Sequence, residues 1–409
     1  MTQDKTNKVS NVPPLRFPEF SGEWDRMRVS DFLDFYSTNS LSWEQLEYGT
    51  GNLCNLHYGL IHVGLPTLIN LSEHILPNIK LDYTPRNYEL CQEGDVAFAD
   101  ASEDTNEVAK VVEFYELQGK DVVCGLHTIH GRDNKGLTIK GFKGYALSSV
   151  TFHDQIRRLA QGTKIYSVST KNFAESYISL PSKEEQSKIV TLLSLLDKRI
   201  ASQIRVIDKL ESLIKGIYNS ILWREYKQVS LSDIFIERNE RTTSNNQYEV
   251  LSSTAKGLFR QADYFDKEVA SANNIGYKVL RLGDVVLSPQ NLWLGNINYN
   301  DIFEIGIVSP SYKVFSIRKQ FNPYYVSCFL KTHRALYEYA NASEQGASVV
   351  RRNLDLDAFM AITFPMPDKD IQDSVSKKLQ AINKKLSVEK QILDKLKEQK
   401  NYLLSQMFI

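Results

Sequence analysis

The sequence has no surplus of charge of either sign, few cysteines and no long apolar run. Lys and Arg number 49 and Asp and Glu number 49 in 409 residues. Because domains that bind nucleic acid are usually basic overall, this balance argues against a generic polyanion binder. The 4 cysteines are too few for a disulfide scaffold. With neither a signal peptide nor a membrane span in the pattern, we expect a cytoplasmic protein.

What the sequence does contain is two heptad stripes of apolar residues. Steps of four and three residues over several heptads are typical of a long helix with a narrow apolar seam, which needs a partner. The first stripe includes Ile189, Leu193, Leu196, Ile200, Ile207 and Leu210. The second includes Val375, Leu379, Ile382, Leu386, Leu393 and Leu396.

The two stripes coincide when they are shifted by 186 residues, and so do their surroundings. Gln186 matches Gln372, and Pro181 matches Pro367 in the same register. Upstream, Gly94-Asp95-Val96 matches Gly283-Asp284-Val285 at a slightly different offset. The sequence therefore predicts an internal duplication, in which each half is a globular module followed by a long helix.

The modules contain short β-branched and aromatic runs separated by turn residues, which favours mixed α/β modules with substantial strand content. Expected strands include 108–112, 122–124, 137–139, 285–287 and 312–317. We expect domains at 1–180 (module 1), 181–224 (first helix), 225–366 (module 2) and 367–409 (second helix). The helices either pair as an antiparallel coiled coil that separates the modules, or each packs on its own module.

Charge is distributed unevenly beneath the neutral total. Residues 31–150 contain 8 basic and 17 acidic side chains, whereas 132–171 contain 8 basic against 2 acidic and 311–352 contain 7 against 2. Two basic stretches at matching places in a duplication are what contacts to phosphates need, although either alone is compatible with a solvated surface.

Several segments together resemble the specificity subunit of type I restriction–modification systems. The chain opens with Val12-Pro13-Pro14-Leu15-Arg16-Phe17-Pro18-Glu19-Phe20 and continues with Gly51-Asn52-Leu53-Cys54-Asn55-Leu56-His57-Tyr58-Gly59. Gly94-Asp95-Val96, Gly125-Leu126-His127-Thr128 and the helix openings at Leu180-Pro181 and Phe364-Pro365-Met366-Pro367 follow. The resemblance covers nearly the whole chain, and it depends on the order of the segments and their duplication.

The resemblance implies a non-catalytic, sequence-specific reader of double-stranded DNA. Each α/β target recognition domain would read one half of a bipartite asymmetric target, and the two-helix coiled coil would set the spacer. Two methyltransferase subunits and two restriction/translocase subunits would be the partners. S-adenosylmethionine, ATP and Mg would bind to those partners, so we expect no cofactor on this chain.

Bases are read by side chains on loops that enter a groove, and phosphates by exposed cations. We expect base readout from loops that follow the Gly-Asp-Val strands and from one aromatic residue: Tyr58, Ser102, Asn106, Gln290, Asn291 and Trp293. The expected phosphate contacts are Lys143, Arg157, Arg158, Lys164, Lys313, Lys319, Arg351 and Arg352.

Other functions find less support in the sequence. Asn322-Pro323-Tyr324-Tyr325 departs from the Asn-Pro-Pro-Tyr of adenine methyltransferases at its third position, and we expect no catalytic residue. Cys54 with His57 and Cys124 with His127 have a spacing compatible with zinc, but module 2 has no counterpart, so we expect no metal. The alternative function is a two-domain protein-interaction scaffold on a coiled-coil spacer.

Overall fold

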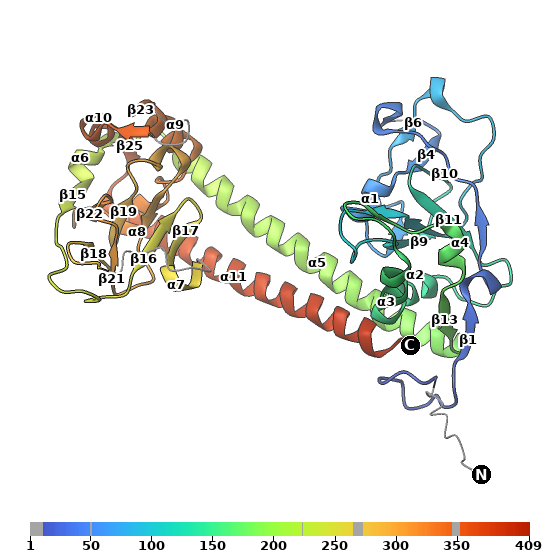
Figure 1. Cartoon of the computed structure of the whole chain (residues 1–409). Coiled ribbons are helices and arrows are strands. Elements are labelled where there is room, and N and C mark those ends of the chain that lie inside the picture. The colour runs from blue at the N-terminus through green and yellow to red at the C-terminus, as the bar shows by residue number, and fades with distance from the viewer. Residues whose placement is uncertain (1–10, 50, 223, 265–272, 346–351) are drawn as a thin grey trace, which may run out of the picture. The chain divides into compact units, whose positions relative to one another are not determined.

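The computed structural model describes residues 11–49, 51–222, 224–264, 273–345 and 352–409. It divides into two compact units, one of residues up to Ile204 together with Gln391–Ile409, and the other of Arg205–Lys390. Each unit contains one module and parts of both long helices, α5 (Lys183–Leu222) and α11 (Lys369–Gln406) (Figure 1). In the described part of the chain, no helix is both long and apolar enough to cross a membrane.

The first unit is a mixed α/β module. Its strands are β1 (Asp25–Arg28), β2 (Asp34–Tyr36), β3 (Leu46–Glu47), β4 (Leu53–Leu56), β5 (Leu68–Asn70), β6 (Asn78–Ile79), β7 (Val96–Ala99), β8 (Ala101–Ser102), β9 (Val111–Glu116), β10 (Asp121–Cys124), β11 (Thr128–Arg132), β12 (Tyr166–Ser167) and β13 (Tyr177–Leu180). Its helices are η1 (Val29–Asp31), η2 (Trp43–Gln45), α1 (Tyr58–His62), η3 (Leu81–Tyr83), α2 (Phe142–Ala146), α3 (Val150–Leu159) and α4 (Thr170–Ala174).

The second unit is built in the same way. Its strands are β14 (Lys227–Ser230), β15 (Phe235–Arg238), β16 (Leu251–Thr254), β17 (Gly257–Arg260), β18 (Lys278–Arg281), β19 (Asp284–Leu287), β20 (Ile297–Tyr299), β21 (Ile305–Val308), β22 (Lys313–Ile317), β23 (Ser343–Gln345), β24 (Arg352–Leu354) and β25 (Thr363–Met366). Its helices are α6 (Leu231–Ile234), α7 (Gln261–Tyr264), η4 (Leu292–Leu294), α8 (Pro323–Ser327), α9 (His333–Asn341) and α10 (Leu356–Ala361).

The duplication is visible in the sheet topology. Module 1 has a sheet of order β2-β11-β7-β9-β5, and module 2 has one of order β15-β22-β19-β20. The strand that carries the valine of each Gly-Asp-Val segment, β7 or β19, occupies the third position of its sheet, and it pairs antiparallel with β11 or β22. A two-stranded ribbon precedes the long helix in each half, β1 with β13 and β14 with β25. The fold class expected from the sequence is confirmed.

Each long helix is tied to its own module by the same glutamine. Gln186 donates to the carbonyl of Pro181 (3.0 Å) and accepts from the backbone N–H of Ile139 (2.9 Å). Gln372 donates to the carbonyl of Pro367 (2.8 Å) and accepts from the backbone N–H of Asn322 (2.8 Å). Both amides are buried. The shared side chain therefore satisfies an unpaired carbonyl before each helix and fixes the segment that enters α2 or α8.

The seams of both helices face protein along their length. The predicted seam positions are buried or half-buried, with Leu193 and Leu379 fully buried. Lys400 forms an ion pair with Asp197 in the first unit (2.7 Å), and Lys390 forms one with Glu211 in the second (2.7 Å). Because the residue number falls along α11 as it rises along α5, the paired helices run antiparallel.

The two ends of the described chain pack together within the first unit. The backbone N–H of Leu15 donates to the carbonyl of Gln406 (2.9 Å), and the Trp24 and Phe408 rings meet edge to face with centroids 6.4 Å apart. Leu403 and Met407 join the core of module 1. The last turn of α11 is therefore part of the first hydrophobic core.

One expected strand is wrong. Residues 137–139 form no strand; they lie in the connection between β11 and α2. The backbone N–H of Ile139 donates to Gln186 instead of to a neighbouring strand. A short apolar run cannot by itself distinguish a strand from a segment that is anchored by a side chain. The other four expected strands overlap β9, β10, β19 and β22.

Candidate nucleic-acid interface

Module 2 brings together four predicted contact residues. The guanidinium carbon of Arg352 lies 4.5 Å from the centroid of the Trp293 ring, and the Arg352 backbone N–H donates to the carbonyl of Gln290 (3.1 Å). Asn291 is half-buried in the same loop. We call Gln290, Asn291, Trp293 and Arg352 the module 2 loop face. An aromatic ring, two amides and an arginine can supply stacking, paired hydrogen bonds and charge.

The loop that carries most of this face is anchored to the module 2 core. Leu292 of η4 is fully buried in the module 2 core, while Trp293 beside it is half-buried. Gly295 ends η4 with a φ of 86°, a backbone conformation that glycine adopts without strain. Arg352 also donates to the carbonyl of Ala340 at the end of α9 (3.3 Å). The loop between β19 and β20 is therefore held against α9 and β24.

Module 1 also gathers predicted residues after its Gly-Asp-Val strand. Arg157 on α3 donates to the side-chain oxygen of Asn106 (2.9 Å) and pairs with Asp154. Asp104 accepts from the backbone and side-chain nitrogens of Asn106, and its own backbone N–H donates to Ser102 (3.1 Å). Hydrogen bonds among its own side chains thus order the loop 102–106. Through Asn106, the loop also contacts Arg157 on α3.

Tyr58 lies beside this loop and contacts two histidines that the sequence did not predict as DNA contacts. Its ring contacts those of His62 and His127, with centroids 5.9 and 5.2 Å apart. His62 Nε2 lies 2.9 Å from the carbonyl of Ala101, next to Ser102. We call Tyr58, His62, Ser102, Asn106, His127 and Arg157 the module 1 loop face.

The signal for His127 lies in its backbone. It has a φ of 53°, in the left-handed region that non-glycine residues seldom occupy. Its Nδ1 lies 3.1 Å from Asp100 Oδ1, so the turn between β10 and β11 holds the ring at the surface. Strained residues of this kind cluster at binding sites, but a sequence does not reveal the φ angle.

One predicted phosphate contact requires correction. Lys143 is buried, with Nζ 3.7 Å from the carboxylate of the fully buried Glu113 and 2.9 Å from the Thr138 hydroxyl. Burial raises the pKa of Glu113, against the opposing effects of Lys143 and of the backbone N–H groups of Gly141 and Gly144. A lysine that compensates a buried carboxylate is not available to a phosphate, and a count of charges along the chain cannot show this.

The remaining predicted cations are scattered. Arg158 and Lys164 are exposed on and after α3, and Lys319 is exposed in the turn after β22. Lys313 is half-buried and pairs with Glu237 (2.8 Å); it lies opposite Leu287, at the end of β19 from which the module 2 loop leaves. Arg351 lies outside the described residues. Among the described residues, Arg157 and Arg352 are the predicted cations that contact predicted base readers.

The aspartates of the two Gly-Asp-Val segments are matched in position but not in surroundings. Asp95 accepts from His130 Nε2 (2.7 Å) and from Arg132 (2.9 Å). Burial acts to raise the pKa of Asp95, but these hydrogen bonds outweigh it and the pKa is lowered. Asp284 accepts from the backbone N–H of Arg281 (2.9 Å) and from a more distant guanidinium, that of Arg238 (3.3 Å), and burial raises its pKa against these contacts.

The methyltransferase-like tetrapeptide has a structural role. Asn322 caps α8: its side-chain oxygen accepts from the backbone N–H of Tyr325 (2.9 Å), and its amide donates to Asp373 (2.6 Å). Pro323 occupies the first helical turn, where a missing N–H costs nothing. The tetrapeptide therefore has a helix-capping role.

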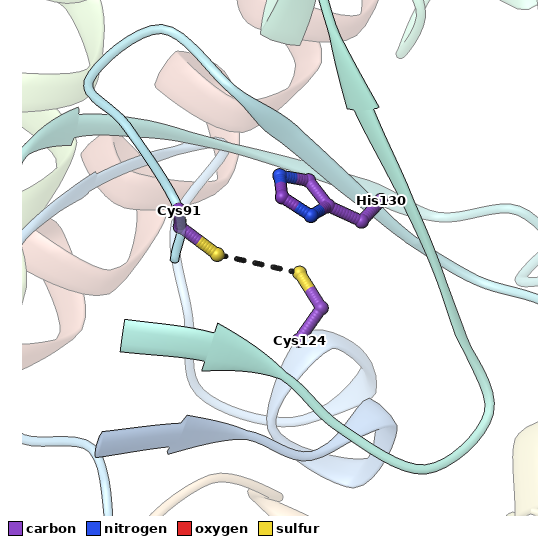
Figure 2. Close-up of side chains that lie close together, drawn as sticks. All are labelled: Cys91, Cys124 and His130. Carbon is purple, nitrogen blue, oxygen red and sulfur yellow. Dashed lines mark hydrogen bonds between the residues drawn. The ribbon is translucent and has the colours of Figure 1, made fainter. Parts of the chain in front are cut away.

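The four residues with zinc-compatible spacing do not gather. Cys54 Sγ donates to Asn78 (3.5 Å), His57 Nδ1 accepts from Gly59 (3.1 Å) and His127 faces Asp100. Within the described residues, the group that could hold a metal ion is instead Cys91, Cys124 and His130, whose ligand atoms lie within 4.8 Å of one another. Figure 2 shows the two sulfurs facing each other beside the imidazole ring.

Comparisons with known proteins agree with this architecture. Residues 117–212 match the family model described as type I restriction modification DNA specificity domain. The fold is similar to that of the type I restriction–modification S subunit from M. genitalium, with a TM-score of 0.58 and 16% identity over 97% of this chain and 99% of that chain. It is also similar to a chain from a structure of complex assembly and conformational transition of the type I R-M system, with a TM-score of 0.53 and 15% identity over 96% and 98%. No curated protein matches. The resemblance seen in the sequence is confirmed.

Proposed function

We propose that this chain is the sequence-specific DNA-binding specificity subunit of a type I restriction–modification complex. The observation that carries the proposal is the repeated loop face. The sheet order β2-β11-β7-β9 in module 1 parallels β15-β22-β19-β20 in module 2. After each Gly-Asp-Val strand comes a loop whose amide or aromatic side chain contacts an arginine from α3 or β24. Each module would read one half of a bipartite, asymmetric double-stranded target, and the antiparallel helices would set the spacer.

The chemistry of the two faces suits base readout. An asparagine or glutamine amide can pair with adenine, and an arginine with guanine, through two parallel hydrogen bonds in the major groove. Asn106 donates one N–H to Asp104 and accepts from Arg157, which leaves one N–H and one lone pair for a base. Trp293 and Tyr58 offer ring surface beside these polar groups.

The negative charge beside the module 1 loop face supports a requirement for partner subunits. Asp100, Asp104 and Asp154 lie against the same residues that would approach DNA. Phosphate contacts supply most non-specific affinity, so a face with this much negative charge binds weakly by itself. Two methyltransferase subunits would add phosphate contacts and S-adenosylmethionine, and two restriction/translocase subunits would add ATP and Mg chemistry in the cytoplasm. This chain would be non-catalytic and carry none of those cofactors.

The direct test is the methylome of cells that carry this gene with its partner genes. We expect modified adenines in a bipartite motif with a fixed spacer, and exchange of residues 31–180 for those of a subunit of different specificity should change one half-site only. If the purified chain recovers neither methyltransferase subunits nor DNA and instead binds other proteins, it is a protein-interaction scaffold on a coiled-coil spacer.

A further inference from the structure

We propose that module 1 binds a zinc ion through Cys91, Cys124 and His130, independently of its function on DNA. The three side chains come from separate elements: the segment before β7, the end of β10 and the middle of β11. All three are buried, and His130 is fully so. A metal there would fasten β10, which belongs to the β10-β4-β6-β3 sheet, to β11 of the other sheet.

The sulfur atoms already have the separation of two zinc ligands. Cys91 Sγ and Cys124 Sγ lie 3.6 Å apart, too far for a disulfide. In a tetrahedral site with Zn–S bonds of about 2.3 Å, two sulfurs lie about 3.8 Å apart. The pair therefore needs little movement to hold a tetrahedral ion, and all four cysteines of the chain are free thiols.

His130 presents the nitrogen that a metal requires. Its Nε2 donates to Asp95 Oδ2 (2.7 Å), so in the neutral ring the proton is on Nε2 and Nδ1 carries a lone pair. Nδ1 is buried and has no hydrogen-bond partner within the described chain. Figure 2 shows this nitrogen on the side of the ring that faces the sulfurs. A histidine held by a carboxylate through its other nitrogen is the usual arrangement around protein-bound zinc.

The charge at the site balances when zinc binds. The ion displaces one proton from each thiol to solvent, and two thiolates then neutralise its charge. Asp95 is already compensated by Arg132, which lies 2.9 Å away. The buried cluster therefore stays neutral, with the fourth position left for a water molecule as in other sites of three protein ligands.

In module 2 the position that corresponds to His130 holds an apolar residue, so the fold does not require a polar side chain there. In the antiparallel register, His130 faces Ala97 of β7, and Val314 faces Val286 of β19, one residue after the matched valines of the Gly-Asp-Val segments. Val314 is fully buried in an apolar cluster with Leu251 and Leu280. An aliphatic side chain fills that place when no ligand is required, which makes an unpartnered imidazole nitrogen beside two thiols in module 1 significant.

Cobalt and zinc binding by the reduced, chelator-stripped full-length chain tests the proposal. We expect one Co²⁺ per chain, with a thiolate-to-cobalt charge-transfer band that zinc abolishes, and one zinc per chain after dialysis against a weak chelator. Cys124→Ser and His130→Val each remove a ligand, so both should bind zinc more weakly by at least the roughly tenfold cost of losing a partner outside the ligand shell. His130→Val copies the solution of module 2, so circular dichroism should show it folded.

The matched controls are Cys54→Ser, another buried cysteine of module 1, and Cys328→Ser in module 2; both should bind zinc as the unmodified chain does. The proposal is overturned if the unmodified chain shows no charge-transfer band, if Cys124→Ser and His130→Val bind zinc as well as it does, or if peptide mapping of freshly prepared chain finds Cys91 joined to Cys124. Each of these results would leave the trio as a hydrogen-bonded thiol pair or a redox pair, and none bears on DNA binding.

Discussion

Arg352 lies over the indole ring of Trp293, with 4.5 Å between its guanidinium carbon and the ring centroid. The contact holds a positive group in one orientation beside Gln290, because a guanidinium stacked on an aromatic face loses less freedom when it binds than a free side chain does. This pair is the most specific prediction of how module 2 would read DNA.

Arg352→Ala should therefore weaken binding of the assembled complex to its target and reduce the salt dependence by about one phosphate contact. Arg352→Lys separates two functions, since lysine keeps the charge but not the planar fork. Rescue by lysine would indicate a phosphate contact, whereas a relaxed methylation motif would indicate base readout. Arg281→Ala is the control, because Arg281 is already paired with Glu240 (2.7 Å). Unchanged affinity and slope for Arg352→Ala would contradict the assignment of the module 2 loop face.

The two modules should be separable by mutation. Arg157→Ala removes the guanidinium that donates to the Asn106 side-chain oxygen and holds this predicted base reader in place. We expect it to weaken discrimination in one half-site, by about 1–3 kcal/mol for a lost base contact, while Arg352→Ala affects only the other half-site. Binding to oligonucleotides with mismatches placed in one half-site at a time measures this. An effect of either variant on both half-sites would argue against one module per half-site.

Lys143→Met should affect folding and not DNA binding. It leaves the Glu113 carboxylate buried without its cation, which costs about 3–5 kcal/mol. The double variant Lys143→Met, Glu113→Gln should recover part of that loss, because no uncompensated charge remains, although the Gln amide can accept from only one of the two backbone N–H groups that Glu113 binds. Thermal melts give the stability, and the salt dependence of DNA binding by the folded double variant should equal that of the unmodified chain. A reduced slope would return Lys143 to the phosphate contacts.

The matched aspartates should respond to pH with opposite signs. The pKa of Asp95 is lowered in the folded chain, so its stabilisation is full above the unfolded pKa of about 3.9 and is lost as the pH falls through the folded value. Asp95→Asn should therefore lower the free energy of unfolding at neutral pH, and this loss should become smaller below about pH 4. The pKa of Asp284 is raised, so its contribution to stability falls as the pH rises from the unfolded pKa through the folded one. The stability of Asp284→Asn should therefore increase relative to that of the unmodified chain as the pH increases. Denaturant unfolding between acid and neutral pH, followed by hydrogen exchange in each module, measures both effects. If the stabilities of the two variants changed with pH in the same direction, the predicted difference between Asp95 and Asp284 would be contradicted.

The glutamines at the helix starts should act locally. Gln372→Ala leaves the carbonyl of Pro367 and the N–H of Asn322 buried without partners, at a cost of about 3 kcal/mol. Hydrogen exchange should accelerate in α8 and the start of α11 but not in module 1. Gln380→Ala, an exposed glutamine on the same helix, is the control. Equal effects of the two variants would mean that the amide contributes nothing to the anchor.

The duplication was predictable from the sequence because it depends on patterns that fold locally. Heptad spacing determines which face of α5 and α11 is buried, and the repeated Gln186 and Gln372 mark equivalent helix starts whatever the modules do. The Gly-Asp-Val segments likewise predict strands in the same place in each sheet, as β7 and β19 show.

The candidate sites were less predictable because they depend on which side chains meet across the fold. Lys143 is in a basic stretch of sequence, yet its partner Glu113 is on a distant strand. Cys124 was paired by spacing with His127, whereas the sheet turns His130 toward it. Arg352 and Trp293 are far apart in the sequence and belong to different elements, so only the packing of η4 and β24 reveals their contact.

The packing of Phe408 against Trp24 and of Leu15 against Gln406 has a consequence for biosynthesis. The ribosome makes most of module 1 first, but the last turn of α11, which fills part of its core, is made only after module 2. Module 1 therefore cannot complete its core until module 2 and α11 have been synthesised. A prematurely terminated chain that lacks only this turn would keep every residue of module 2 and expose apolar surface on module 1, where chaperones and proteases recognise incomplete proteins.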